Sequence, residues 1–560
     1  MVHPKARRAD SPEDQAEDQA EDQAEDQAED QAEDQAAPAV VGGERAVARP
    51  PAASGLRRRI GKPGVIDACL AVVVGLAVLL VHDVPYLLHQ SFWVDEAWVA
   101  DTVRAPIGLT HSLGLITPLG WTFLLRLVPF GGPERLRLVP LAFAGLTAAT
   151  GYLFGRELRL TRFTTGILTG AAALLSPAML VQNDLKEYTA EAFACLVMWT
   201  LVARIENEWR LRRLAAIAAV ASIGLLFANT LLFVGLAVMA SLALECLVTR
   251  RYRRLIELVG ASAGMLVVSL VIYELVLHPE VNSKVTAYWD AFYVPHRSAS
   301  GAVSFIMTGL HQLAPYMGFP SLIVDTVLAL AGIAALIWFR RYALAALFPV
   351  TLAIIIVASA AREYPFGDTR TSTFWLVVVP VLMAVAVAAA GQLSARIDRR
   401  VPLVVTAVAL AVWVPATNAY IRSHSIPVED VHSEVTYLDA HFRHGDVVVV
   451  SYGASYGFAY YYPPNPSFPV GDGPNDHVVA YPRLPWMVVL TARRAVDITN
   501  ALAAARAKIA SEPPGSRGRI WIVRSHQNRT EVRAWRRDLA GDRVRVIHVG
   551  PDPILLYTPS

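Results

Sequence analysis

Long apolar runs recur along the chain from Gly64 to Tyr420. Runs of about 20 residues are long enough to cross a hydrocarbon core of about 30 Å as a helix. The pattern therefore predicts about eleven membrane-spanning helices. They are expected at residues 64–82, 136–155, 163–181, 189–203, 214–229, 231–248, 255–277, 321–339, 342–360, 374–391 and 402–419.

The pattern changes from about Ile421, where short apolar runs alternate with amphipathic stretches. "GDVVVVSYG" and "GRIWIVRSH" are typical of buried strands, and "RVRVIHVG" with "PILLYTP" is typical of a closing hairpin. Helices are expected in "VEDVHSEVTYLDAHFRH", "AVDITNALAAARAKIA" and "NRTEVRAWRRDLA". Strands that alternate with helices predict a small α/β domain over residues 421–560. No glycine-rich phosphate loop occurs in it, so no nucleotide is expected there.

Residues 1–62 follow neither pattern. The motif Glu-Asp-Gln-Ala is repeated six times from Glu13 to Ala36. A helix of this period would place like charges four residues apart, where they repel, and it would have little to bury. We expect a disordered, solvated tail, and docking to a basic partner is the alternative.

The composition also favours a polytopic membrane protein. The chain is 54% hydrophobic and only 18% charged, which excludes a set of soluble domains of this size. All three cysteines lie in apolar runs, so no disulfide framework is expected. No His/Cys cluster has the spacing of metal ligands, which leaves a metal requirement open. Nucleic acid is not expected as a partner.

Arginine clusters between the apolar runs orient the protein, because short cytoplasmic loops are enriched in Lys and Arg. This rule places the tail in the cytoplasm and residues 421–560 outside, in a multi-pass protein of the cytoplasmic membrane. The loops that hold Asp95, Lys186, Tyr288 and Tyr364 then also face outward. The clusters lie at residues 57–62, 156–162, 204–213, 250–254, 340–341 and 396–400.

The stretch "QSFWVDEAWVADTVR" follows the first run and carries Asp95 and Glu96 between Trp93 and Trp98. Trp residues are typical of the headgroup level, so a short helix along the membrane surface is expected. A carboxylate there can take a proton from a soluble acceptor while a lipid-borne donor arrives from the side. Burial and the neighbouring Glu are expected to raise the pKa of Asp95. The alternatives are a solvated helix face and a divalent cation held by the two carboxylates.

Cations on the outward side run against the charge bias that orients the rest of the chain. Lys186 lies beside Asp184 and Tyr188 in "LLSPAMLVQNDLKEYTAEAF". Either the charges at this helix end neutralise one another, or the Lys and the Tyr hydroxyl hold a phosphate. Arg370 in "EYPFGDTRTSTF" is similar: it is either a snorkelling side chain after a turn or a phosphate ligand.

"FWVDEAW" followed by "TPLGWTFLLRLVPFGGPERLRLVPLAFAGLTAATGYLFGREL" resembles the N-terminal half of GT-C glycosyltransferases. The resemblance is to bacterial relatives of protein O-mannosyltransferases and of the lipid A aminoarabinose transferase. "SPAMLVQNDLKEYTAEAF", "AYWDAFYVP", "YPFGDTR" and "HFRHGDVVVVSYGASYGFAYYY" are similar to later landmarks, so the match extends over most of Val65 to Tyr462. A second interfacial helix is expected within "THSLGLITPLGWTFLLRLVPF".

This resemblance implies an all-α transmembrane domain over residues 63–420 and inverting transfer of a sugar from a polyprenyl-phosphate donor to an extracytoplasmic acceptor. The acceptor would be an envelope glycan, a lipid or a protein. Asp95 would be the general base, and Glu96 would assist it or bind a cation. Lys186, Tyr188, Arg370 and Arg137 would hold the donor. Further substrate contacts are expected at Trp93, Trp98, His111, Asp184, Tyr288, Trp289 and Tyr364.

Two other classes of function fit many spans and phosphate-binding cations. A lipid or sugar transporter or flippase is expected to have charged residues or Gly/Pro breaks deep within spans, and internal repeats, and neither feature is clear here. A non-catalytic envelope assembly protein would use the C-terminal domain alone. An Asp95→Asn protein that folds but loses activity argues against the second alternative.

Overall fold

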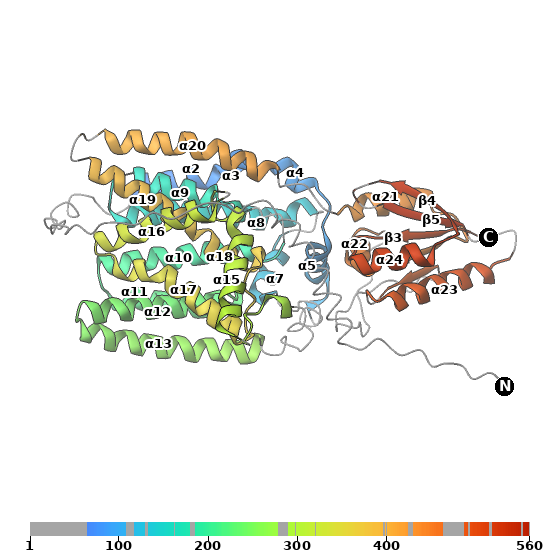
Figure 1. Ribbon diagram of the computed structural model, residues 1–560, viewed down its shortest axis with the longest axis horizontal. Helices are drawn as coiled ribbons and strands as arrows, with labels where there is room; N and C mark the ends of the chain where they lie inside the picture. The colour runs from blue at the N-terminus through green and yellow to red at the C-terminus, as the bar shows by residue number, and fades with distance from the viewer. Residues whose placement is uncertain are drawn as a thin grey trace.

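A computed structural model gives the fold as a bundle of long helices with a small sheet domain at one end (Figure 1). The acidic tail, which we expect to be disordered, lies outside the residues that the structure describes. The structure describes residues 64–107, 117–128, 133–161, 163–179, 185–277, 289–296, 298–319, 321–395, 398, 400–423, 429–462, 486–490, 493–513, 518–549, 551 and 553–558.

Helices occupy every segment where the apolar pattern predicts a span. Among the described residues, seven helices are long and apolar enough to cross a membrane, and three shorter apolar helices accompany them. The protein is therefore a multi-pass membrane protein, while the number of spans stays a prediction. The helices of the bundle are α2 (Val65–Leu76), α3 (Val78–Val81), α8 (Pro133–Leu158), α9 (Thr164–Leu174), α10 (Tyr188–Asn207), α11 (Leu211–Ile223), α12 (Leu231–Val248), α13 (Tyr252–Ile272), α16 (Leu322–Trp338), α17 (Tyr342–Ala360), α18 (Thr369–Leu376), α19 (Val378–Ser394) and α20 (Val401–Ser423).

Several bundle helices end at an arginine in the left-handed backbone region that usually favours glycine. Arg250 has a φ of 55° and Arg340 a φ of 56°. In each case the next residue closes the helix end, since Arg251 N–H donates to Cys246 O and Arg341 N–H to Leu336 O, both at 2.8 Å. Arg at these positions costs backbone strain, because the left-handed region brings Cβ close to the following carbonyl oxygen.

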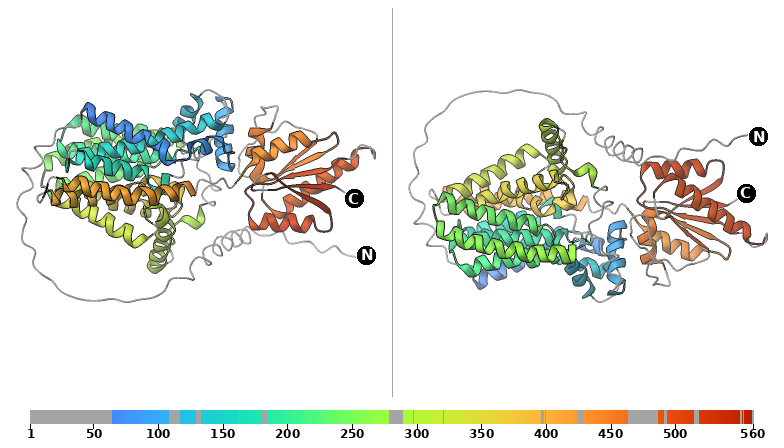
Figure 2. Two further views of the ribbon diagram at one scale, coloured as in Figure 1. Left: turned by 90° about the horizontal axis from the view of Figure 1, so that it is seen from above. Right: turned by 90° about the horizontal axis from the view of Figure 1, so that it is seen from below.

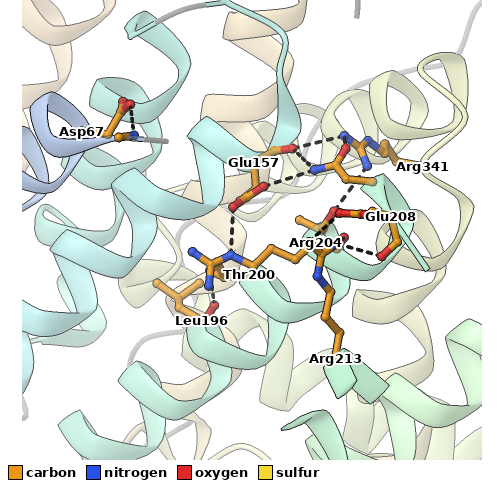
Figure 3. Close-up of polar contacts among 11 residues, drawn as sticks. Asp67, Glu157, Leu196, Thr200, Arg204, Glu208, Arg213 and Arg341 are labelled. Carbon is orange, nitrogen blue, oxygen red and sulfur yellow. Dashed lines mark hydrogen bonds and ion pairs between the residues drawn. The ribbon is translucent and has the colours of Figure 1, made fainter. Parts of the chain in front are cut away.

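The same end of the bundle is held by a buried polar network (Figure 3). Arg341 is 1% exposed and donates to Asn207 Oδ1 at 2.6 Å and to the Glu157 carbonyl at 3.1 Å. Glu157 also accepts from Arg204 Nε at 2.8 Å. The network joins α8, α10 and α17, so it satisfies a buried cation while fixing three helices relative to one another.

Short helices fill the opposite end of the bundle. α4 (Val84–His89), α5 (Val94–Arg104) and α7 (Leu119–Arg126) follow the first span, and α15 (Ala299–Leu313) precedes α16. α5 and α7 lie where the two interfacial helices are expected. We call this side of the bundle the α5 end.

The C-terminal domain is a five-stranded sheet of order β2-β1-β3-β5-β4. β1 pairs in parallel with β2 and β3, and β5 pairs antiparallel with β3 and β4. All predicted strands and helices are present, whereas α22 and β2 are additional. The elements are α21 (Val431–His441), β1 (Val447–Val450), α22 (Tyr452–Tyr461), β2 (Met487–Val489), α23 (Ala495–Ser511), β3 (Ile520–Val523), α24 (Arg529–Asp538), β4 (Arg543–His548) and β5 (Pro553–Thr558).

Helices cover both faces of this sheet. Side chains on both sides of β1 are therefore buried, so its sequence is an unbroken apolar run. Val447 and Val449 pack with α23 and α24 on one face. Val448 and Val450 pack with α21 and α22 on the other. The domain therefore has its own core, independent of the bundle.

Asp446 ties the start of β1 to β3. The side chain is 1% exposed and accepts from Arg519 Nη2 at 2.7 Å and from Trp521 Nε1 at 2.8 Å. Burial opposes its charge, yet these hydrogen bonds hold the pKa of Asp446 below its usual value. Its contribution to stability is therefore present above the unfolded-state pKa of about 3.9 and is lost as pH falls through the folded-state pKa.

Asp446→Asn is expected to lower the stability of the C-terminal domain by about 1–3 kcal/mol, because a neutral amide leaves some of these donors unmatched. Hydrogen exchange of the β1 and β3 amides in the full chain measures this loss. Asp542→Asn is the matched control, since Asp542 pairs with Arg506 nearer the surface, with its side chain 23% exposed. Equal protection from hydrogen exchange in both variants would contradict the role of Asp446 in joining β1 to β3.

The C-terminal domain docks on the α5 end of the bundle, as both views in Figure 2 show. α22 packs against α5, with Trp98 stacked on Tyr456 and Phe92 edge-on to Tyr460. The Phe92 N–H donates to Tyr461 Oη at 2.8 Å. Because α22 directly follows β1, the carboxyl ends of the parallel strands β1 and β3 face α5.

Candidate active site

α5 is held at both of its ends by other parts of the chain. Its N-cap residue, Trp93, supplies no side-chain cap. Instead the Val94 N–H donates to Glu429 Oε2 of the C-terminal domain at 2.9 Å. At the other end, Arg126 Nη2 of α7 donates to the carbonyls of Thr102 and Ala105 at 2.8 and 2.7 Å. The first turn of α5 is thus fixed in position before any substrate binds.

Asp95 in this first turn contacts two cations from distant segments. Arg370 Nη1, on the first turn of α18, donates to Asp95 Oδ2 at 2.7 Å. Lys186 Nζ, just before α10, lies 3.5 Å from the same oxygen. The fold therefore brings together three residues that the sequence singled out for one site.

Aromatic rings line the two cations. The Arg370 guanidinium lies 5.3 Å from the centre of the Trp93 ring, and Lys186 Nζ lies 5.3 Å from the centre of the Trp98 ring. The Lys186 segment is itself anchored, because Trp121 Nε1 donates to the Leu185 carbonyl at 2.7 Å. Cation–π contacts of this kind hold a cation in place without neutralising its charge.

The electrostatics of Asp95 differ from the expectation. Burial does oppose its charge, but Lys186, Arg370 and His526 outweigh that effect and hold the pKa of Asp95 below its usual value. The raised pKa of Asp95 that the sequence analysis expects is therefore wrong. Burial does disfavour the charged form, as expected, but the sequence does not show the cations that surround the carboxylate and lower its pKa.

The three side chains remain open to solvent in part, with exposed fractions of 22% for Asp95, 16% for Lys186 and 26% for Arg370. Arg370 is also 3.5 Å from Asp368 Oδ2, the carboxylate that caps α18. An anion that reaches this site can replace Asp95 as the partner of both cations. Such an exchange would release the carboxylate to act as a base.

Glu96 and Arg137 occupy a different environment from the one expected. Glu96 is 0% exposed, and both of its oxygens accept from Arg137, at 3.0 and 2.6 Å. The other N–H groups of Arg137 donate to the carbonyls of Leu87, Gln90 and Ser91. All five guanidinium donors are thus engaged within the protein. We therefore propose a structural role for this pair, in place of catalytic assistance and donor binding.

The remaining predicted contacts are dispersed. Tyr188 is buried at the start of α10. Tyr364 donates to the Thr371 carbonyl at 2.8 Å and packs against Phe374. Trp289 packs on Phe292 in another loop. His111, Asp184 and Tyr288 lie outside the described residues, so their predicted contacts stay predictions.

A cation held jointly by Asp95 and Glu96 has little support from the geometry, because the Glu96 oxygens face Arg137 and Asp95 faces two cations. Within the described part of the chain, no group of three His, Cys, Asp or Glu side chains could hold a metal ion.

Two residues near the site were missed by the sequence reasoning, Glu429 and His526. His526 lies against Trp93, with ring centres 6.1 Å apart. It follows β3 in "IWIVRSH", at the carboxyl end of a parallel strand, where ligand-binding residues of α/β folds are often found. This position at the end of a predicted strand was the one feature of the sequence that could have identified His526 as a site residue.

Comparisons with known proteins give matches at the level of structure. No family model and no curated protein matches the sequence. Two similar solved structures are of ArnT from Cupriavidus metallidurans. The structure bound to undecaprenyl phosphate has a TM-score of 0.49 and 13% sequence identity, and the match covers 88% of this chain and 97% of that chain. The apo structure has a TM-score of 0.48 and 14% identity, with the same coverage.

Proposed function

We propose that this protein is an integral membrane glycosyltransferase that moves a sugar from a polyprenyl-phosphate donor to an acceptor outside the cytoplasmic membrane. The observation that carries the proposal is Asp95 held between Lys186 and Arg370. A partly exposed carboxylate supplies a base, and two cations supply a phosphate site beside it. Both lie at one end of a membrane bundle, where a lipid-borne donor has access.

In the proposed reaction the donor phosphate first replaces Asp95 as the partner of Lys186 and Arg370. Asp95 then takes the proton of an acceptor hydroxyl while the acceptor oxygen forms a bond to the anomeric carbon of the sugar. The bond from that carbon to the phosphate oxygen breaks on the opposite face, so the configuration inverts. The electron pair leaves with polyprenyl phosphate, whose charge the two cations stabilise.

The orientation belongs to the same proposal. The arginines that end α8, α12 and α16 lie at the end of the bundle away from α5, as the positive-inside rule requires if that end faces the cytoplasm. The C-terminal domain and the Asp95 site then face outward, where the acceptor is present.

Purified protein in nanodiscs, incubated with radiolabelled polyprenyl-phosphate mannose, glucose and arabinose, tests the proposal. Consumption of one donor with label in an acceptor fraction is the expected result. If no donor is consumed, and labelled lipid instead moves between the leaflets of proteoliposomes, the protein is a flippase.

Lys186→Met and Arg370→Gln are each expected to weaken donor binding. A hydrogen bond to a charged group contributes about 1.5–3 kcal/mol, which corresponds to roughly a 10- to 100-fold rise in Kd. Binding of a labelled polyprenyl-phosphate sugar to nanodiscs measures this change. Arg362→Gln is the matched control, because Arg362 pairs with Asp290 in another loop and its side chain is 49% exposed. Donor affinity that falls equally in the control would count against a specific phosphate site.

The pH dependence of transfer should differ between kcat/KM and kcat. In the free enzyme Lys186 and Arg370 hold the pKa of Asp95 below its usual value, so the acid limb of kcat/KM is expected below about pH 4. Bound donor phosphate takes over both cations, so the pKa of Asp95 rises in the complex. The acid limb of kcat should therefore lie at higher pH than that of kcat/KM. Limbs that coincide, or the reverse order, would contradict the exchange of partners.

A further inference from the structure

Glu429 connects the C-terminal domain to the residue next to Asp95. Its carboxylate is 1% exposed, and each of its oxygens has a separate partner. Oε2 accepts from the Val94 N–H at 2.9 Å, and Oε1 lies 2.6 Å from His526 Nδ1. Because a carboxylate can only accept, Nδ1 carries the proton, which fixes the orientation of the imidazole ring.

His526 adopts a backbone conformation that residues other than glycine seldom use, with a φ of 49°. Its surroundings enforce this conformation. The Arg493 guanidinium donates to the His526 carbonyl at 3.1 Å. Gly453 at the start of α22 lies so close that an added Cβ would be 2.2 Å from the Ser525 carbonyl oxygen. Backbone strain that is held by close packing on several sides is typical of functional sites.

The imidazole also faces the site itself. It lies against Trp93, the ring that supports Arg370. A residue that only joined two domains would not need this position. His526 therefore affects the place of the first turn of α5 and the environment of the base together.

We propose that Glu429 and His526 are positioning residues, through which the C-terminal domain holds the first turn of α5 so that Asp95 can meet an acceptor hydroxyl. The proposal rests on the proposed transferase function. It gives the C-terminal domain a defined part in the reaction: transfer requires the docked domain, and loss of the pair lowers kcat while the donor site on Lys186 and Arg370 is kept.

The experiment compares His526→Ala, His526→Asn and the control His548→Ala in full-length protein in nanodiscs. Asn tolerates the left-handed backbone region and can donate to Glu429 through its amide, so it should restore much of what Ala loses. His548 lies on β4, is exposed, and tests the loss of an imidazole elsewhere in the same domain. Hydrogen exchange of a peptide that covers residues 92–98 is measured together with the kinetics of transfer.

For His526→Ala we expect exchange in this peptide to speed up about tenfold, since the Val94 hydrogen bond weakens. We expect kcat to fall about 10- to 100-fold, because a displacement of about 1 Å has effects of this size, with KM for the donor unchanged. A rise in donor KM alone, or exchange like that of the control, would overturn the proposal. If wild-type protein transfers no sugar, the proposed function fails, while the exchange result still decides whether the pair positions α5.

Discussion

Asp95→Asn is expected to lower sugar transfer about 10²- to 10⁴-fold, the range that positioned base catalysis supplies. The amide cannot take a proton from the acceptor, although it has nearly the same size and can still accept from Arg370. Donor affinity should stay equal or increase, because the phosphate no longer competes with a carboxylate for Lys186 and Arg370. A large loss of kcat without a loss of donor binding is the signature of a base.

The control for this prediction is Asp290→Asn, which removes a carboxylate paired with Arg362 on an exposed loop of the bundle. It should leave both kcat and donor affinity close to those of the wild type. Single-turnover kinetics with a saturating labelled donor separate chemistry from product release. An Asp95→Asn protein that transfers sugar at the wild-type rate would remove Asp95 from the mechanism.

Arg137→Met is expected to lower the free energy of unfolding by about 3–5 kcal/mol, as is usual when one partner of a buried ion pair is removed. Glu96 would lose its counter-charge at a position that is 0% exposed, where burial already raises the pKa of its carboxyl, and the carbonyls of Leu87, Gln90 and Ser91 would lose their donor. Unfolding by SDS titration in mixed micelles measures the change.

Adding Glu96→Gln to Arg137→Met should recover part of this loss, because a neutral amide needs neither a counter-charge nor a proton, although the three carbonyls stay unmatched. Unfolding of Arg137→Met, compared with its donor affinity, also decides whether Arg137 has a structural role beside Glu96 or binds the donor. A variant that unfolds as the wild type does but binds donor more weakly would favour the phosphate contact that the sequence suggested.

Elements set by local periodicity could be predicted from the sequence. The apolar runs mark α12 (Leu231–Val248) and α17 (Tyr342–Ala360) to within a few residues, because a span must be both long and apolar. In the C-terminal domain, "VVVV" of β1 indicates a strand covered on both faces. β2 was missed although the apolar run "WMVVL" marks it, a run with the length of a buried strand, of which three residues pair with β1.

Partners across the fold could not be predicted in the same way. Asp95, Lys186 and Arg370 were each selected, but Arg370 lies 275 residues from Asp95 in the chain and its contact depends on the packing of α18 against the bundle. Arg137 looked like another phosphate ligand, since the sequence does not show that Glu96 accepts from both Nε and Nη2 of its guanidinium. His526 is 97 residues from Glu429, and neither belongs to a motif.

The position of a bound phosphate tests the central claim most directly. A cryo-EM map of the protein in nanodiscs with polyprenyl phosphate should show the phosphate in contact with Lys186 Nζ and the Arg370 guanidinium, with Asp95 no longer paired with either. A lipid phosphate bound elsewhere, with Asp95 still held between both cations, would contradict the proposed site and its chemistry.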